Sequence, residues 1–128
     1  MDLKESACAL LSTTTVSFAA DAHTTLYTVP VGKRCILSHA VVVVNADAST
    51  TDVSIGANGT ETDFCGPFTL ELINAQYDTF IMRPIGVIAT TGQPLLCKSY
   101  AAATVIEMAV TNQAGAAGSV VYLYGTLY

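Results

Sequence analysis

The sequence predicts an all-β protein, an antiparallel β-sandwich of about eight strands with a jelly-roll-like arrangement. Three observations predict it. Apolar runs rich in β-branched residues recur along the chain, turn residues separate them at regular spacing, and no segment shows helical periodicity over an ordinary helix length. At 128 residues and 13.3 kDa, the chain is long enough for one domain with its own core.

The first two expected strands flank a proline-glycine turn. In the stretch "TTLYTVPVGKRCILSHAVVVVN", Pro30 and Gly32 separate a strand over Leu26–Pro30 from a longer strand over Cys35–Asn45. A half-buried strand alternates apolar and polar residues, but Ala40–Val44 is apolar throughout. We therefore expect both faces of this longer strand to be covered.

Turn and loop residues bound the later strands. Asn58-Gly59 is a strong hairpin-turn signal, and residues 61–67 are interpreted as a loop closed by Gly66-Pro67. The segment "YAAATVIEMAV" is assigned to a strand, with a helix as the alternative, because its β-branched residues and the following "TNQ" outweigh its alanines. The remaining strands are expected at Asp52–Ile55, Phe68–Leu72, Tyr77–Arg83, Leu95–Tyr100, Thr104–Asn112 and Ser119–Leu127, with a short one at Val87–Ala89.

Residues 1–23 do not follow the strand pattern. The segment is rich in Ser, Thr and Ala and lacks sustained periodicity, so we expect an N-terminal arm at 1–23 before a β-sandwich domain at 24–128. A secretory signal peptide is disfavoured because Asp2 and Glu5 offset Lys4, and because "STTT" interrupts the apolar stretch.

The chain carries few charges. Charged residues make up 12% of it, where roughly 25% is usual for a soluble domain. The longest strictly apolar run is far shorter than the about 20 residues of a membrane-spanning helix, so we expect protein neighbours rather than a membrane to cover this surface. The net charge of −5 opposes nucleic-acid binding, which needs a basic patch. The sequence therefore predicts a homo-oligomer or a component of a larger shell.

No metal site or cofactor is expected. His23 and His39 show no ligand spacing, and the chain has no C-x-x-C pair. The even number of cysteines permits two disulfides, but a chain this apolar does not need them, so buried free thiols are the expected state. The four cysteines are Cys8, Cys35, Cys65 and Cys97.

No catalytic residues are expected either, so the protein is predicted not to be an enzyme. His23 lies near Asp21, but no G-x-S-x-G motif accompanies them, and a histidine beside an aspartate is common on protein surfaces. His39 falls within an apolar strand, where a hydrogen-bonded structural histidine is the expectation. Glu71 and Glu107 could be written as a glycosidase pair, but solvated carboxylates on strands are far commoner.

The opening stretch resembles small structural proteins of tailed bacteriophages. Its Thr-Leu-Tyr-x-Val-Pro-x-Gly-Lys motif, the strand that follows and the polar hairpin over Asn45–Ile55 are similar to that group. The C-terminal "VTNQAGAAGSVVYLYGTLY" is similar to the group's closing Gly/Ala turn and last strand. The resemblance covers most of the chain from Thr24 onward. It implies a virion β-domain, such as a capsid decoration (cement) protein, a head fibre, or a tail or baseplate module.

A capsid decoration protein is the function that we expect from this resemblance. Such a domain would form a compact homo-oligomer, a trimer, assemble in the host cytoplasm and bind the major capsid protein of the head, which it would stabilise by mass action. One alternative is a tail, baseplate or fibre-tip module, for which Tyr100 is the one evident loop-edge aromatic. The other is a carbohydrate-binding β-sandwich, which would need a row of aromatics or a calcium site.

The last expected strand supplies a candidate interface. Alternation places Val121, Leu123 and Leu127 on one face, the natural core face, and tyrosines on the other. A row of exposed tyrosines is costly on the surface of a monomer, so we expect this face to form an interface. The alternative is that the tyrosines lie on a solvated face of the sheet. With the outer face of the valine run, the expected interface residues are Val41, Val43, Tyr122, Tyr124 and Tyr128.

Overall fold

A computed structural model describes residues 8–84, 98–112 and 116–128 of the chain. These residues form nine β-strands and no helix, so the all-β prediction is confirmed. Within the described ranges, no helix is present that could cross a membrane. The strands are β1 (Ala9–Phe18), β2 (Ala22–Thr28), β3 (Cys35–Val44), β4 (Asp52–Ala57), β5 (Thr60–Thr69), β6 (Thr79–Met82), β7 (Ser99–Tyr100), β8 (Val105–Thr111) and β9 (Ala116–Leu127).

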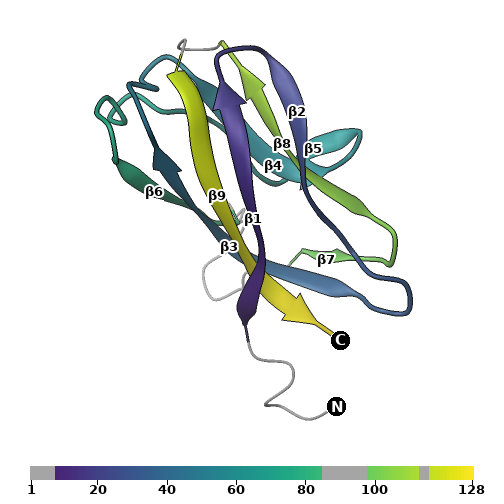
Figure 1. Ribbon diagram of the computed structural model, residues 1–128. Coiled ribbons are helices and arrows are strands. Elements are labelled where there is room, and N and C mark those ends of the chain that lie inside the picture. Colours follow the sequence, from purple (N-terminus) through teal and green to yellow (C-terminus); the bar gives the residue numbers. More distant parts are fainter. Residues whose placement is uncertain (1–7, 85–97, 113–115) are drawn as a thin grey trace, which may run out of the picture.

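The strands form two antiparallel sheets packed face to face (Figure 1). The first sheet has the order β1-β9-β3-β6, with the two-residue β7 paired to one end of β3, and the second has the order β2-β8-β4-β5. Apart from β7, the chain changes sheet at every connection except the β4–β5 hairpin. This is the double Greek-key connection of a jelly roll, so the predicted antiparallel sandwich is confirmed.

The core lies between the sheets, and strand alternation fills it. In β3, Ala40, Val42 and Val44 are completely buried, whereas Val41 and Val43 are half-buried and point to the opposite face. The second sheet contributes the buried side chains Val53, Ile55, Ile106, Met108 and Val110. The apolar valine run thus fills the core with one face and lies on the outer surface with the other.

The prediction of an N-terminal arm at residues 1–23 is wrong for residues 8–23, the part of that segment that the structure describes. Ala9–Phe18 forms β1, which pairs with β9, and Val16 and Phe18 are 1% and 0% exposed. β1 is an edge strand whose outer face is polar after Leu10, so its Ser/Thr run concealed the two large core residues. The sandwich therefore includes both β1 and β2, which begins at Ala22.

The loop expected at 61–67 lies within β5. Pro67 has no N–H to donate, and β5 accommodates it because β5 is the outer strand of its sheet. Gly66 has a φ of +97°, and a Cβ there would lie 2.7 Å from the carbonyl oxygen of Val53, so this position requires glycine. The predicted Asn58-Gly59 turn is confirmed, since these two residues join β4 to β5.

Most of the other expected strands are confirmed, with shifted ends. The segment "YAAATVIEMAV" begins at the last residue of β7, includes most of β8 and contains no helix, and Tyr77–Arg83 contains β6. Of the strand expected at Leu95–Tyr100, the described part is β7. The short strand expected at Val87–Ala89 and Cys97 lie outside the described residues.

The three cysteines that the structure describes are free thiols. Cys35 and Cys65 are buried, as expected, whereas Cys8 is exposed, which corrects the expectation for that residue. Burial raises the pKa of Cys35 to about 11 and that of Cys65 to about 12. Because the thiolate is the reactive form, both buried cysteines are protected by lack of access and by protonation.

Thiol labelling at neutral pH is expected to separate these cysteines. Iodoacetamide should modify Cys8 in the native protein and leave Cys35 and Cys65 unmodified until guanidinium unfolds the chain. Peptide mapping by mass spectrometry, with and without denaturant, measures the modification at each position. Labelling of Cys35 or Cys65 in the native protein at the rate of Cys8 would contradict the burial described here.

Candidate functional site

The two sheets differ in charge. None of the strands of the first sheet, β1, β3, β6 and β9 with the short β7, contains Asp, Glu, Lys or Arg. The strands of the second sheet contain Asp52, Glu61, Asp63 and Glu107, and neither Lys nor Arg. The sandwich therefore has one layer without formal charge and one acidic layer.

The strand register aligns apolar side chains across the outer face of the first sheet. Tyr122 of β9 lies between Thr13 of β1 and Val41 of β3, and Ile81 of β6 is the next neighbour of Val41. A parallel row contains Val120 of β9 and its partner on β3, Val43. Directly opposite residues on adjacent strands point to the same face, so these rows form one continuous surface.

Another row contains Leu10, Tyr124 and His39. The rings of His39 and Tyr124 stack with their centroids 4.7 Å apart and an interplanar angle of 10°. The His39 Nδ1 atom also lies 2.9 Å from the hydroxyl of Ser38. The expectation of a hydrogen-bonded structural histidine at position 39 is confirmed.

The residues expected at an interface lie on this side of the sheet. Val41, Val43, Tyr122 and Tyr124 are half-buried, and Tyr128, just after β9, is 41% exposed. Below them, Val121 and Leu123 are completely buried, so the predicted alternation along the last strand is confirmed. We call the outer surface formed by Leu10, Val41, Val43, Ile81, Val120, Tyr122 and Tyr124 the tyrosine–valine face.

Leu10 and Ile81 belong to the tyrosine–valine face although the sequence did not predict them there. Leu10 is 51% exposed and Ile81 is 52% exposed, so they are the most exposed apolar side chains of this face. Leu10 lies in the segment interpreted as an arm. Ile81 joins the face through the pairing of β6 with β3, a long-range contact that no local pattern encodes.

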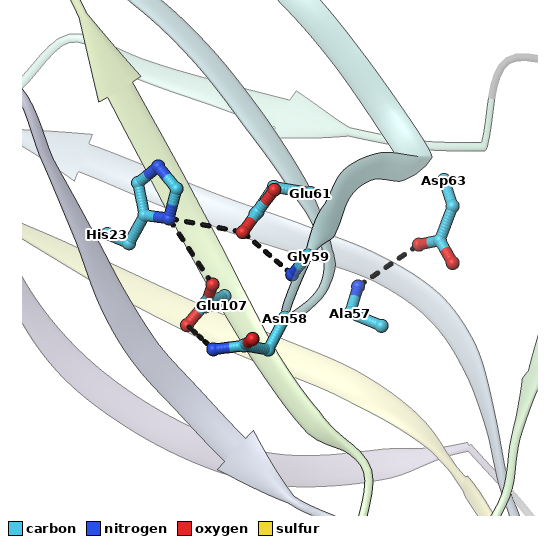
Figure 2. Close-up of polar contacts among 7 residues, drawn as sticks. All are labelled: His23, Ala57, Asn58, Gly59, Glu61, Asp63 and Glu107. Atoms are coloured by element: carbon cyan, nitrogen blue, oxygen red, sulfur yellow. Dashed lines mark hydrogen bonds and ion pairs between the residues drawn. The ribbon is translucent and has the colours of Figure 1, made fainter.

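A polar cluster lies on the outer side of the second sheet (Figure 2). His23 Nδ1 is 3.1 Å from Glu61 Oε1 and 3.4 Å from Glu107 Oε1. Glu61 also accepts a hydrogen bond of 2.9 Å from the backbone N–H of Gly59, which holds the pKa of its carboxyl group below the ordinary value. The sequence placed His23 beside Asp21, whereas the fold brings it to two glutamates from distant strands.

Gly56 makes room for this cluster. It pairs with Glu107 across the β4–β8 ladder, and the β4–β5 hairpin folds back closely over it. A Cβ at position 56 would clash with the carbonyl oxygen of Thr60 and would lie 2.7 Å from the carbonyl carbon of Glu61. The absent side chain thus lets the start of β5 approach β4 and brings Glu61 near Glu107.

Two other residues singled out from the sequence lie elsewhere. Tyr100, considered as an exposed loop aromatic, is only 4% exposed, and its hydroxyl donates a hydrogen bond of 2.7 Å to Asp63 Oδ1. Burial, followed by the hydrogen bond to Asp63, raises the pKa of Tyr100. Glu71 lies exposed in the turn after β5, beyond Thr69, which pairs with Asp52 at the start of β4. Glu107 pairs with Gly56 near the other end of β4, so the register separates the two glutamates.

No protein-family model matches the sequence, and no curated protein matches it. Solved structures that are similar in fold include chains of two phage capsids. A chain of the cyanophage Pam1 capsid asymmetric unit aligns with a TM-score of 0.60 and 18% identity, over 97% of this chain and 86% of that chain. A chain of the acidic stable capsid structure of Helicobacter pylori bacteriophage KHP30 aligns with a TM-score of 0.63 and 16% identity, over 95% of this chain and 89% of that chain. The shared fold therefore extends over nearly the whole of each chain.

Proposed function

We propose that this protein is a non-enzymatic structural component of a bacteriophage virion, a capsid decoration protein that binds the major capsid protein of the assembled head. The nearly full-length likeness to chains of two phage capsid structures supports a virion role. The resemblance of the opening and closing motifs to tailed-phage structural proteins points in the same direction. The observation that carries the proposal is the tyrosine–valine face, since a half-exposed apolar surface without formal charge suits contact between the subunits of an assembly.

The tyrosine–valine face fits contact between copies of this chain. In a lone subunit, Leu10 and Ile81 are half exposed beside two tyrosines, on a sheet without formal charge. Burying apolar surface contributes about 25 cal/mol per Å², and tyrosine rings lose little conformational entropy when they are fixed at an interface. A closed trimer would cover this face on every subunit with one repeated contact.

The remaining surface of the trimer would bind the head. A protein that binds only the assembled lattice stabilises that lattice by its binding free energy, and three linked subunits multiply the effect through avidity. This mechanism needs no catalytic group and no cofactor. It needs a rigid body, which the two packed sheets supply.

A binding experiment with empty heads tests this function. Purified heads that lack the protein are mixed with it and imaged by electron microscopy, with untreated heads and purified tails as controls. Regular added density on the head lattice, with heads that withstand a higher temperature, is the expected result. Density on the tails alone would assign the protein to a tail or baseplate module, and no density on either particle would contradict a virion role.

A further inference from the structure

We infer that His23, Glu61 and Glu107 form a zinc-binding site on the outer side of the second sheet. The three residues come from β2, β5 and β8, and one ligand atom from each lies within 4.8 Å of the other two. This inference does not rest on the proposed function, since the tyrosine–valine face belongs to the other sheet. It changes the expectation that the histidines take no part in a metal site.

Two of the three distances between the donor atoms match those of a tetrahedral zinc ion, and the two carboxylate oxygens lie within 4.8 Å of each other. With zinc–nitrogen and zinc–oxygen bonds of about 2.0–2.1 Å, two neighbouring ligands of a tetrahedron lie about 3.3 Å apart. His23 Nδ1 lies 3.1 Å from Glu61 Oε1 and 3.4 Å from Glu107 Oε1. Figure 2 shows both carboxylates directed at this one nitrogen. The site is therefore preorganised around His23 Nδ1.

Glu107 provides the independent observation that a ligand is required. The residue is 4% exposed, and its Oε1 atom accepts no hydrogen bond from any described residue; His23 Nδ1 lies 3.4 Å from it but is closer, at 3.1 Å, to Glu61. Its other oxygen, Oε2, accepts a hydrogen bond of 3.4 Å from the side-chain amide of Asn58, which orients the carboxylate. A buried carboxylate oxygen without a donor is costly, and a bound cation removes that cost. Metal ligands are commonly held in this way by a neighbouring hydrogen bond.

The charge around the cluster also calls for a cation. Within the described ranges, no Lys or Arg pairs with Glu61 or Glu107, and His23 is the partner of both. A single Nδ1–H can donate a good hydrogen bond to one of the two carboxylates only. A divalent ion bound to Nδ1 and to one oxygen of each glutamate satisfies all three groups and offsets both negative charges.

The donor set favours zinc over calcium or magnesium. Calcium takes six to eight oxygen ligands and magnesium prefers an octahedron of oxygens, whereas imidazole with carboxylates in a tetrahedron is a zinc environment. The side chain of His23 is 54% exposed, so water can fill the fourth position. Bound zinc would join β2 and β8 to the start of β5, and would stabilise the outer side of the second sheet.

Zinc titration of the full chain tests this site. The Cys8→Ser variant serves as the parent, because the exposed thiol of Cys8 is itself a candidate zinc ligand. Isothermal titration calorimetry with zinc chloride should give one zinc per chain. His23→Ala and Glu107→Gln should each weaken zinc binding by at least about 100-fold, since each removes a direct ligand. Glu71→Gln, which changes an exposed carboxylate outside the cluster, is the matched control and should bind zinc as the parent does.

Two further measurements keep the result decisive. Cobalt(II) in place of zinc should give the intense visible absorption of a tetrahedral site in the parent and lose it in His23→Ala. Zinc, and not millimolar calcium or magnesium, should raise the melting temperature of the parent and leave that of His23→Ala unchanged. If circular dichroism shows that Glu107→Gln is unfolded, Glu61→Gln replaces it in the comparison. Absence of zinc binding to the parent, or equally tight binding to the His23 and glutamate variants, would overturn the inference.

Discussion

Replacing Phe18 with alanine is expected to lower the free energy of unfolding by about 3–5 kcal/mol, as removal of a fully buried phenylalanine does in other cores. Phe18 lies at the end of β1 and is 0% exposed. The loss is large because the ring is completely buried in the core between the two sheets, so its removal leaves a cavity. Urea unfolding followed by circular dichroism at a fixed protein concentration measures the difference.

Ser17→Ala is the matched control for this variant. Ser17 is the neighbour of Phe18 on the same strand, but its side chain is exposed, so the change should stay within about 0.5 kcal/mol. If β1 were an arm outside the core, both variants would unfold at the urea concentration of the parent. Equal midpoints for Phe18→Ala and the parent would therefore contradict the position of β1 in the first sheet.

The Tyr122→Ala/Tyr124→Ala double variant is expected to dissociate the proposed homo-oligomer while each subunit stays folded. Both rings lie on the tyrosine–valine face, and the core residues beneath them, Val121 and Leu123, are unchanged. Loss of two interface tyrosines should weaken association by about 3 kcal/mol or more, which is over about 100-fold in Kd. Sedimentation velocity from micromolar to nanomolar concentration measures the shift.

Tyr77→Ala is the control for the loss of a tyrosine ring. Tyr77 is 71% exposed in the turn before β6 and is not one of the residues of the tyrosine–valine face, so its removal should leave the sedimentation of the oligomer unchanged. Circular dichroism of all variants checks that the β-structure is retained. A double variant that sediments like the parent at nanomolar dilution would show that this face is not the contact between subunits.

The parts of the fold that follow from local alternation were predictable from the sequence. The valine run of β3 and the tyrosine strand β9 both follow a period of two, which fixes the face of each side chain once the strand is assigned. The Asn58-Gly59 turn was equally predictable, because few conformations suit that pair of residues between two strands. These signals lie within a few residues of one another.

The parts that depend on long-range pairing could not be predicted in the same way. β1 carries few large apolar residues, and its place becomes evident only beside β9, almost the full chain length away. Gly66-Pro67 resembled the end of a loop, because sequence alone did not show that β5 lies at the edge of its sheet. The cluster of His23, Glu61 and Glu107 depends on three strands, so no spacing rule for metal ligands could identify it.

The strands of the first sheet contain no Asp, Glu, Lys or Arg. This composition determines how salt and temperature would affect a protein contact made through that sheet. Coulomb attraction between formal charges takes no part in such a contact, so dissolved ions have nothing to screen. Concentrated sulfate would tighten it, because excluded salts favour burial of apolar surface, whereas cooling and urea would loosen it. An oligomer held together by this layer would therefore withstand high salt concentrations and would dissociate more readily in the cold.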